Sequence, residues 1–140
     1  MLSATSALRS TVDDPWESVA RVVELHADAD WGDVATNGTA MWHLWHTVDC
    51  FRHHAGKVIA GDLEWDGELA NDACPTPAAL RDQLRTDVDR FCTWVDAQSD
   101  DRLARMFDHG TPMNAQDMIN LMIRHILWHT ARAHGILVSK

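Results

Sequence analysis

The sequence predicts an all-α protein, a bundle of four long helices, and three observations lead to this prediction. Apolar residues recur three and four positions apart in four stretches, as they do on the buried face of an amphipathic helix. Capping residues, prolines and glycines separate these stretches. No segment alternates apolar and polar residues as a half-buried strand does. The 140 residues, 46% of them hydrophobic, suffice for one domain over positions 1–140, with positions 1–12 expected to be flexible.

The first helix is expected to begin at Asp14. The side chain of Asp14 can accept free amide protons of a first helical turn, Pro15 suits the first helical position, and Glu17 completes a capping box. Apolar residues follow at helical spacing as far as the polar stretch 28–32, where this helix should end.

The second helix is expected to start with Thr39 as its cap and to end near Ala60. The stretch 61–75 then shows no helical pattern and exceeds the usual helix-to-helix connection of about 2–8 residues. A connection of this length permits a crossover along the bundle, so the second and third helices can run parallel. The stretch is also a candidate lid or pocket rim, with Trp65 as its largest apolar residue.

The third helix is expected to open at Thr76 and Pro77, again a cap followed by proline. A short helical turn over 101–107 and a break over 109–112 should follow. The fourth helix is expected to span about 114–138.

Charge and composition argue against several kinds of partner and location. The formal net charge is −9 and Lys and Arg do not cluster, so nucleic acid and anionic membranes are poor partners. The first residues lack the features of a signal peptide, and no apolar stretch approaches the roughly 20 residues that span a bilayer, which favours a cytoplasmic protein. Three cysteines at unrelated spacings predict free thiols rather than disulfides.

Nine histidines are many for this length, and two of them form a pattern. His125 and His129 are four positions apart, so they share one face of the last helix, which Met118 and Met122 border. Two imidazoles at this spacing can bind one metal ion, at about 2.0–2.1 Å each for zinc. The alternative is a pair of core histidines that hydrogen bond to other side chains, although a shared ion would remove the cost of burying them unpaired.

The second helix supplies a third candidate ligand. A stripe at spacings of three and four runs along this helix, and its members are His43, His46, Cys50, His53 and Lys57. A metal site in a bundle takes ligands from facing helices, so His46, His125 and His129 together predict a three-histidine centre. Structural zinc sites use four protein ligands, whereas three ligands and an open position are typical of a catalytic site.

Other catalytic motifs do not account for these histidines. The segment 125–129 lacks the glutamate of the HExxH zinc-protease motif, and no glutamate has a histidine three positions later, as di-iron bundles require. Glycine-rich phosphate loops and the GxSxG elbow do not occur.

Two segments resemble signatures of the DinB/YfiT-like superfamily. Residues 42–49 (Trp-His-Leu-Trp-His-Thr-Val-Asp) resemble its second-helix signature, and residues 125–131 (His-Ile-Leu-Trp-His-Thr-Ala) resemble its fourth-helix signature, His-x-x-x-His before small residues. The resemblance covers nearly the whole chain in helix order, length and the long middle connection. It departs after the last histidine, where many members have Arg-Gly-Gln and this chain has Thr-Ala-Arg over 130–132.

The resemblance implies an up-down-down-up four-helix bundle with a long crossover between helices two and three, a central divalent metal, and frequent homodimers. His46, His125 and His129 match the family's ligand positions. Several relatives are thiol S-transferases that join bacillithiol or mycothiol to electrophiles, and another is a mycothiol-dependent isomerase. The resemblance therefore implies a small-molecule partner, with a low-molecular-weight thiol as the most concrete example.

Three residues beside His46 are candidate catalytic groups. His43 is a candidate alternative ligand or proton shuttle, although a supporting or core role is the simpler interpretation. Asp49 would either orient a ligating imidazole or be a solvated charge. Cys50 would be a ligand or nucleophile as a thiolate, whereas as a thiol it would be a small buried residue.

The pattern favours a metal-dependent transferase or hydrolase. A divalent ion would lower the pKa of water or of a bound thiol, which makes a nucleophile near neutral pH, and the resemblance favours S-transfer from a mycothiol-like thiol to an electrophile. Zinc is the first choice of metal, and imidazole ligands leave nickel, iron and manganese open. The alternatives are a non-catalytic stress-response or binding protein stabilised by the metal, and a helical bundle without metal.

Overall fold

A computed structural model describes residues 3–140 and confirms the all-α prediction, because most of this part of the chain is helical. Its helices are α1 (Ala4–Asp13), α2 (Val19–Leu25), α3 (Ala40–Ile59), α4 (Pro77–Asp96), α5 (Asp100–Leu103) and α6 (Ala115–Val138). Two short strands, β1 (Phe107–Asp108) and β2 (Pro112–Met113), pair in an antiparallel hairpin. Over residues 3–140, no helix is both long and apolar enough to cross a membrane.

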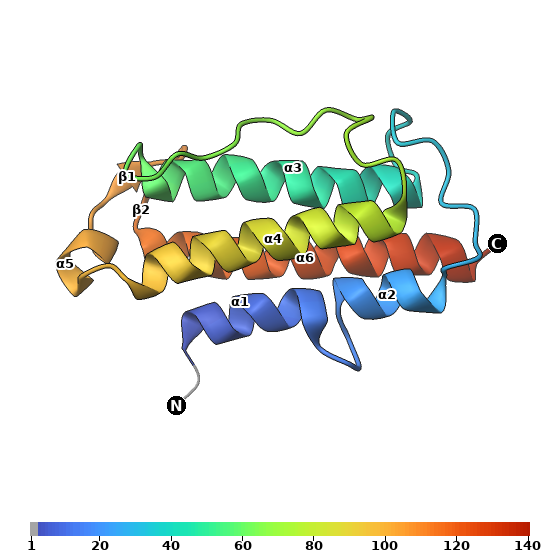
Figure 1. Cartoon of the computed structure of the whole chain (residues 1–140), viewed down its shortest axis with the longest axis horizontal. Helices are drawn as coiled ribbons and strands as arrows, with labels where there is room; N and C mark the ends of the chain where they lie inside the picture. The colour runs from blue at the N-terminus through green and yellow to red at the C-terminus, as the bar shows by residue number, and fades with distance from the viewer. Residues whose placement is uncertain (1–2) are drawn as a thin grey trace.

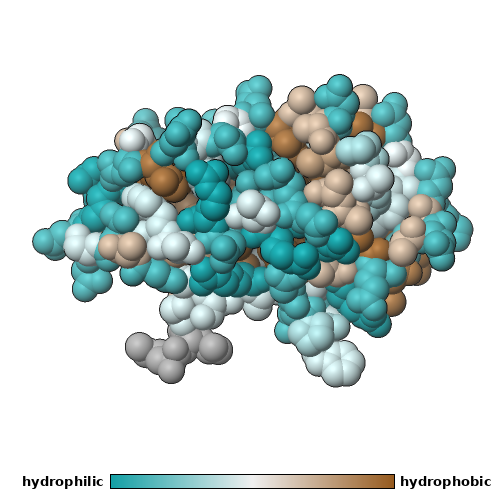
Figure 2. All heavy atoms as spheres, in the orientation of Figure 1, coloured by the Kyte–Doolittle hydropathy of each residue, from teal (hydrophilic) through white to brown (hydrophobic). Residues whose placement is uncertain are grey.

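The long helices α3, α4 and α6 lie alongside one another, and α1 and α2 follow each other along one side of them (Figure 1). The segment between α3 and α4 runs back over the length of α3, so these two helices point the same way (Figure 1). α6 points in the opposite direction, as do α1 and α2 (Figure 1). Hydrophilic residues cover most of the face in Figure 2, and hydrophobic residues surface mainly near the end where α3 begins.

Positions 1–12 were expected to be flexible, whereas the structure has a helix over most of them, and residues 1–2 lie outside the described part. Residues 4–13 form α1, which Ser3 caps by accepting a hydrogen bond from the Ser6 amide. Leu8 and Val12 are fully buried in the core. The Thr5 hydroxyl donates to the Asp96 carboxylate at 2.9 Å, so α1 is tied to the end of α4.

The predicted helix start at Asp14 is also wrong. The Asp14 carboxylate accepts hydrogen bonds from the amides of Trp16 and Glu17, but these bonds close a turn rather than begin a helix. Ser18 caps α2 instead, and Trp16 is 83% exposed. The capping pattern at Asp14 therefore forms its hydrogen bonds, but no helix begins directly after it.

Three other predicted helix starts are confirmed. Thr39, Thr76 and Asn114 cap α3, α4 and α6, and each side chain accepts a hydrogen bond from the amide three residues later. Asn114 and Asp117 form a reciprocal capping box. These caps fix where the three long helices begin.

The segment between α4 and α6 differs in detail from the prediction. The expected turn over 101–107 is the four-residue α5, and the expected break over 109–112 is the turn of a hairpin. Gly110 has φ +81°, a left-handed conformation that glycine adopts without strain. Two-residue strands are too short to show alternation in the sequence, so the prediction that no strand occurs missed them.

The long connection 61–75 contains no helix or strand, as predicted, but contacts with α3 hold it in place. Leu69 is held at both backbone groups, because the Trp45 indole N–H donates to its carbonyl at 2.9 Å and its amide donates to Asp49 Oδ1 at 2.8 Å. The Trp65 indole N–H donates to the Arg52 carbonyl oxygen at 2.9 Å. The crossover is therefore a fixed wall along one side of α3.

Candidate metal centre

Three imidazoles from two helices meet between α3 and α6. The ring centroids of His125 and His129 are 4.4 Å apart, and the ring of His46 on α3 lies 5.4 Å from the first and 4.7 Å from the second. The Nε2 atoms of His125 and His129 are 3.1 Å apart. The structure therefore brings the three histidines of the sequence prediction into one cluster.

Neighbouring side chains hold two of these rings. Trp42 stacks on His46 with centroids 4.5 Å apart and an interplanar angle of 10°. His43, which is buried, has its Nδ1 2.8 Å from the Nδ1 of His129. This contact occupies the far nitrogen of His129 and leaves its Nε2 toward His125. A histidine that binds metal is commonly oriented in this way by a partner on its other nitrogen.

The spacing of the ring nitrogens suits a shared ion. Two nitrogens bound tetrahedrally to zinc at about 2.0–2.1 Å lie about 3.3 Å from each other. The observed 3.1 Å between Nε2 of His125 and Nε2 of His129 is close to that value. One proton between the two nitrogens would also give this distance, so the pair alone does not distinguish a hydrogen bond from a metal.

Cys50 joins the cluster one helical turn after His46. Its sulfur lies 3.4 Å from Nε2 and 3.6 Å from Nδ1 of His46. Donor atoms of His46, Cys50 and His125 all lie within 4.8 Å of one another. Burial raises the pKa of the Cys50 thiol to about 11, and the nearby Asp49 carboxylate adds to this shift. Without a cation beside it, Cys50 is therefore a thiol near neutral pH rather than a free thiolate.

The electrostatics of the cluster favour neutral imidazoles. Burial lowers the pKa of His46 and of His125, and it lowers the pKa of His129 to about 4, with further lowering by the neighbouring histidines. Neutral imidazole is the form that binds metal ions. The three imidazoles are thus held in the protonation state that a cation requires.

Two further histidines, His54 and His109, lie at the edge of the site. The ring of His54 lies 5.7 Å from that of His125, and the ring of His109 in the hairpin turn lies 4.9 Å from that of His54. His54 Nδ1 is buried without a hydrogen-bond partner, and burial lowers the pKa of this residue to about 4. His109 is 55 positions from His54, so no local spacing could have indicated this contact.

One family model matches the chain, that of the DinB superfamily, over residues 11–133. The chain belongs to the DinB superfamily. The match includes both helices that carry the histidine cluster, except for the last five residues of α6. Among the curated proteins and the solved structures, no match reaches significance.

The donor set of this DinB-superfamily chain fits a divalent metal ion. Three neutral imidazoles and a thiol are nitrogen and sulfur donors of the kind that zinc prefers. At the edge of the cluster, the buried Nδ1 of His54 lacks a hydrogen-bond partner. A cation bound by His125 and His129 would take the place of a proton shared between their Nε2 atoms.

The structure gives Asp49 and Trp128 roles that the sequence did not suggest. The Asp49 carboxylate accepts a hydrogen bond from the Leu69 amide, so it anchors the crossover rather than an imidazole of α6. Trp128 lies between the two histidines of α6 in sequence but is 64% exposed, so it points away from the cluster. Trp128 directly precedes His129, and side chains of adjacent residues on a helix point in different directions.

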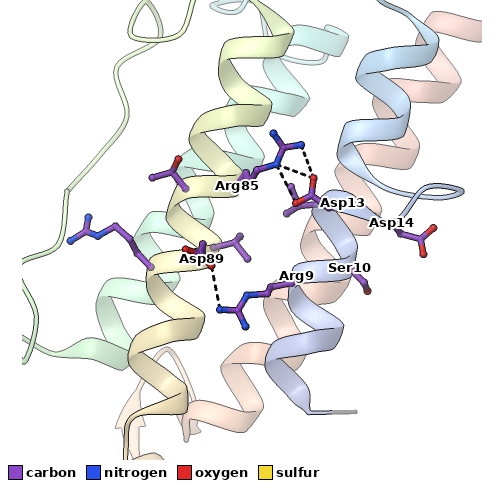
Figure 3. Close-up of a pocket in the computed structure, with 10 residues that line it drawn as sticks. Arg9, Ser10, Asp13, Asp14, Arg85 and Asp89 are labelled. Carbon is purple, nitrogen blue, oxygen red and sulfur yellow. Dashed lines mark hydrogen bonds and ion pairs between the residues drawn. The ribbon is translucent and has the colours of Figure 1, made fainter. Parts of the chain in front are cut away.

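Two surface cavities differ in their relation to the cluster. A groove of about 540 Å³ lies between α3 and the crossover, and Asp49, Cys50, His53, Lys57 and Trp65 are among the residues that line it. Its volume is in the range of small-molecule sites, and it reaches the cluster at Cys50. A larger cavity of about 740 Å³ lies between α1 and α4 (Figure 3) and has no histidine or cysteine in its lining.

The cavity between α1 and α4 is lined by ion pairs. Arg85 points to Asp13 and Arg9 points to Asp89, at 2.6 and 3.3 Å (Figure 3). These arginines are paired with carboxylates of the protein, so they are poorly disposed to bind an anionic ligand. The groove beside Cys50 is therefore the better candidate for a substrate site.

Proposed function

We propose that this protein is a divalent-metal-dependent enzyme of the DinB type, with the ion, most simply zinc, bound by His46, His125 and His129. Its reaction would be transfer of a low-molecular-weight thiol of the mycothiol kind to an electrophile, and hydrolysis is the nearest variant. Nickel, iron and manganese are the other metals that such a set of imidazoles would accept.

One observation carries this proposal: the convergence of three imidazoles from α3 and α6, with Nε2 of His125 and Nε2 of His129 3.1 Å apart. Membership of the DinB superfamily and the groove that meets the cluster at Cys50 support it. A bound divalent ion lowers the pKa of a thiol or water, which supplies a nucleophile near neutral pH.

The protein's own residues would orient and enclose the reactants. The contact of His43 with His129 sets which nitrogen of His129 faces the centre, and Trp42 holds the plane of the His46 ring by stacking. The crossover, fixed by Trp45 and Asp49 at Leu69, would form one wall of the substrate groove. Lys57 lines the same groove and is suited to a carboxylate of the substrate.

For the scaffold, we infer the up-down-down-up four-helix bundle of the family, with α1 and α2 together as its first helix and residues 1–140 as one domain. The directions of the helices in Figure 1 agree with this topology. We also infer a cytoplasmic protein whose partner is a small molecule rather than nucleic acid, in keeping with the net charge of −9. Homodimerisation remains an expectation from the family.

The second candidate is a non-catalytic stress-response or binding protein in which the metal ties α3 to α6. The position of Cys50 favours it, because Cys50 with three histidines would make four protein ligands, the number typical of structural zinc sites. Under this hypothesis, removal of the metal would strongly lower the melting temperature, whereas a catalytic ion would leave the metal-free fold largely intact.

The test is a transfer assay with the zinc-loaded protein, a panel of low-molecular-weight thiols including mycothiol, and a chromogenic electrophile. We expect metal-dependent acceleration that is lost in His46→Ala and retained in His134→Gln, whose ring contacts His26 instead of the cluster. Full metal occupancy without acceleration of thiol transfer or of hydrolysis would contradict the enzyme and favour the second candidate.

A further inference from the structure

The donor atoms between α3 and α6 include one that the three-histidine centre leaves unused, the sulfur of Cys50. The ligand atoms of His46, Cys50 and His125 lie within 4.8 Å of one another, and His129 Nε2 is 3.1 Å from His125 Nε2. Three atoms this close share a point at most about 2.8 Å from each, so bonds of about 2.0–2.3 Å require shifts of less than about 1 Å.

A directed hydrogen bond does not explain the contact between Cys50 and His46. The sulfur is 3.4 Å from Nε2 and 3.6 Å from Nδ1, so it lies against the ring rather than in line with the lone pair of either nitrogen. Trp42 stacks on the same imidazole, so His46 is held between neighbours along its own helix.

Cys50 is also the member of this cluster that meets the groove. Cys50 lines the groove of about 540 Å³ between α3 and the crossover, whereas His46, His125 and His129 do not. A molecule that enters through this groove therefore reaches the centre where the Cys50 sulfur lies. A thiol substrate would bring the same kind of donor atom to the same place.

Building on the metal centre proposed above, we propose that Cys50 is its fourth ligand and is displaced by the thiol substrate. In the resting protein, the sulfur would bind as a thiolate after releasing its proton to solvent. An incoming thiol would take its place, and the proton of that thiol would pass to the Cys50 sulfur as it leaves. The Cys50 side chain would thus occupy the substrate's coordination position on the metal while the groove is empty.

A sulfur ligand has a consequence for the metal. Thiolate is a soft donor, which favours zinc over magnesium, calcium and manganese. It also distinguishes the two functional candidates, because an exchangeable Cys50 leaves the centre open to substrate, whereas a permanent fourth ligand closes it.

The test is absorption spectroscopy of the full chain loaded with Co²⁺. Visible bands report that cobalt is bound, and a near-ultraviolet charge-transfer band reports a thiolate bound to it. We expect both in the wild-type protein and in the control Cys74→Ser, whose thiol is buried outside the cluster. In Cys50→Ser, the near-ultraviolet band should disappear while the visible bands remain. Added mycothiol or 2-mercaptoethanol should then restore it.

The outcomes of this experiment distinguish a failure of the Cys50 proposal from a failure of the three-histidine centre. Visible bands without a near-ultraviolet band in the wild type would overturn Cys50 as a ligand and leave the centre standing. Loss of the band in Cys50→Ser that no added thiol restores would overturn the displacement. An absence of visible bands in the wild type would instead contradict the three-histidine centre.

Discussion

α3 buries polar side chains on two faces, one toward α4 and one toward α6. The partners of these side chains differ between the two faces. Toward α4, Arg52 donates to Asp87 at 2.7 Å, and Gln83 donates to the same carboxylate at 2.9 Å. Toward α6, His46 meets other imidazoles, the Cys50 thiol and the stacked ring of Trp42, and the nearby His54 Nδ1 has no partner. The first face pairs a buried cation with a buried anion, whereas the second face brings together neutral imidazoles that are able to bind a cation.

This difference separates a stabilising contact from a functional one. A buried ion pair whose hydrogen bonds are made ties two helices together and needs nothing further. Clustered neutral imidazoles with lowered pKa values add little to stability, but they bind a divalent ion without first losing protons. Changes on the α4 side should therefore alter folding, and changes on the α6 side should alter metal binding.

The largest effect is expected from Asp87→Ala. This change leaves the buried guanidinium of Arg52 with only the exposed Asp66 carboxylate, 3.9 Å away, which should lower the free energy of unfolding by about 3–5 kcal/mol. Urea denaturation measures it, with Asp82→Ala as the control because the Asp82 side chain is exposed. Metal bound per folded chain should not change. A loss below about 1 kcal/mol would show that the ion pair does not hold α3 to α4.

A smaller effect is expected from His43→Gln. Loss of the contact between His43 and His129 should weaken metal binding by about 10–100-fold, because the ligand would no longer be held in its orientation. Competition with a chelating dye gives the dissociation constant, and His134→Gln is the matched control on α6. Equal affinity in both variants would exclude a positioning role for His43.

Acid should destabilise the metal-free protein gradually. The pKa values of His54 and His129 are lowered from 6.5 to about 4, so the unfolded chain takes up protons at a higher pH than the folded chain. Stability is complete above pH 6.5, falls as the pH drops toward 4 and levels off below it, as far as these two residues are concerned. In His54→Gln the fall should be shallower, and an unchanged pH profile of the unfolding midpoint would contradict this assignment.

Local chemistry explains which parts of the fold were predictable. Thr39, Thr76 and Asn114 begin helices because their own side chains cap the next turn, so a few residues contain the whole signal. Asp14 shows the limit, because the same kind of bonds closed a turn there. The helix over residues 4–13 was missed because its stability comes from packing of Leu8 and Val12 in the core.

In the site, too, the contacts that depend on local spacing along one helix were predictable. His125 and His129 meet because residues four apart share a helix face, and the same rule brings Cys50 to His46. His109 reaches His54 only through the hairpin, and Leu69 meets Asp49 only through the path of the crossover. Contacts that depend on how distant segments pack leave no periodic signal in the sequence.

The central claim is that a divalent cation binds the imidazoles between α3 and α6. The metal content of the purified protein tests this claim most directly. Protein purified without a histidine tag or chelator would be analysed by plasma mass spectrometry together with His129→Ala. We expect about one transition-metal ion per chain in the wild type and almost none in the variant. Equal metal content in the two proteins, or none in the wild type even after reconstitution, would contradict the claim.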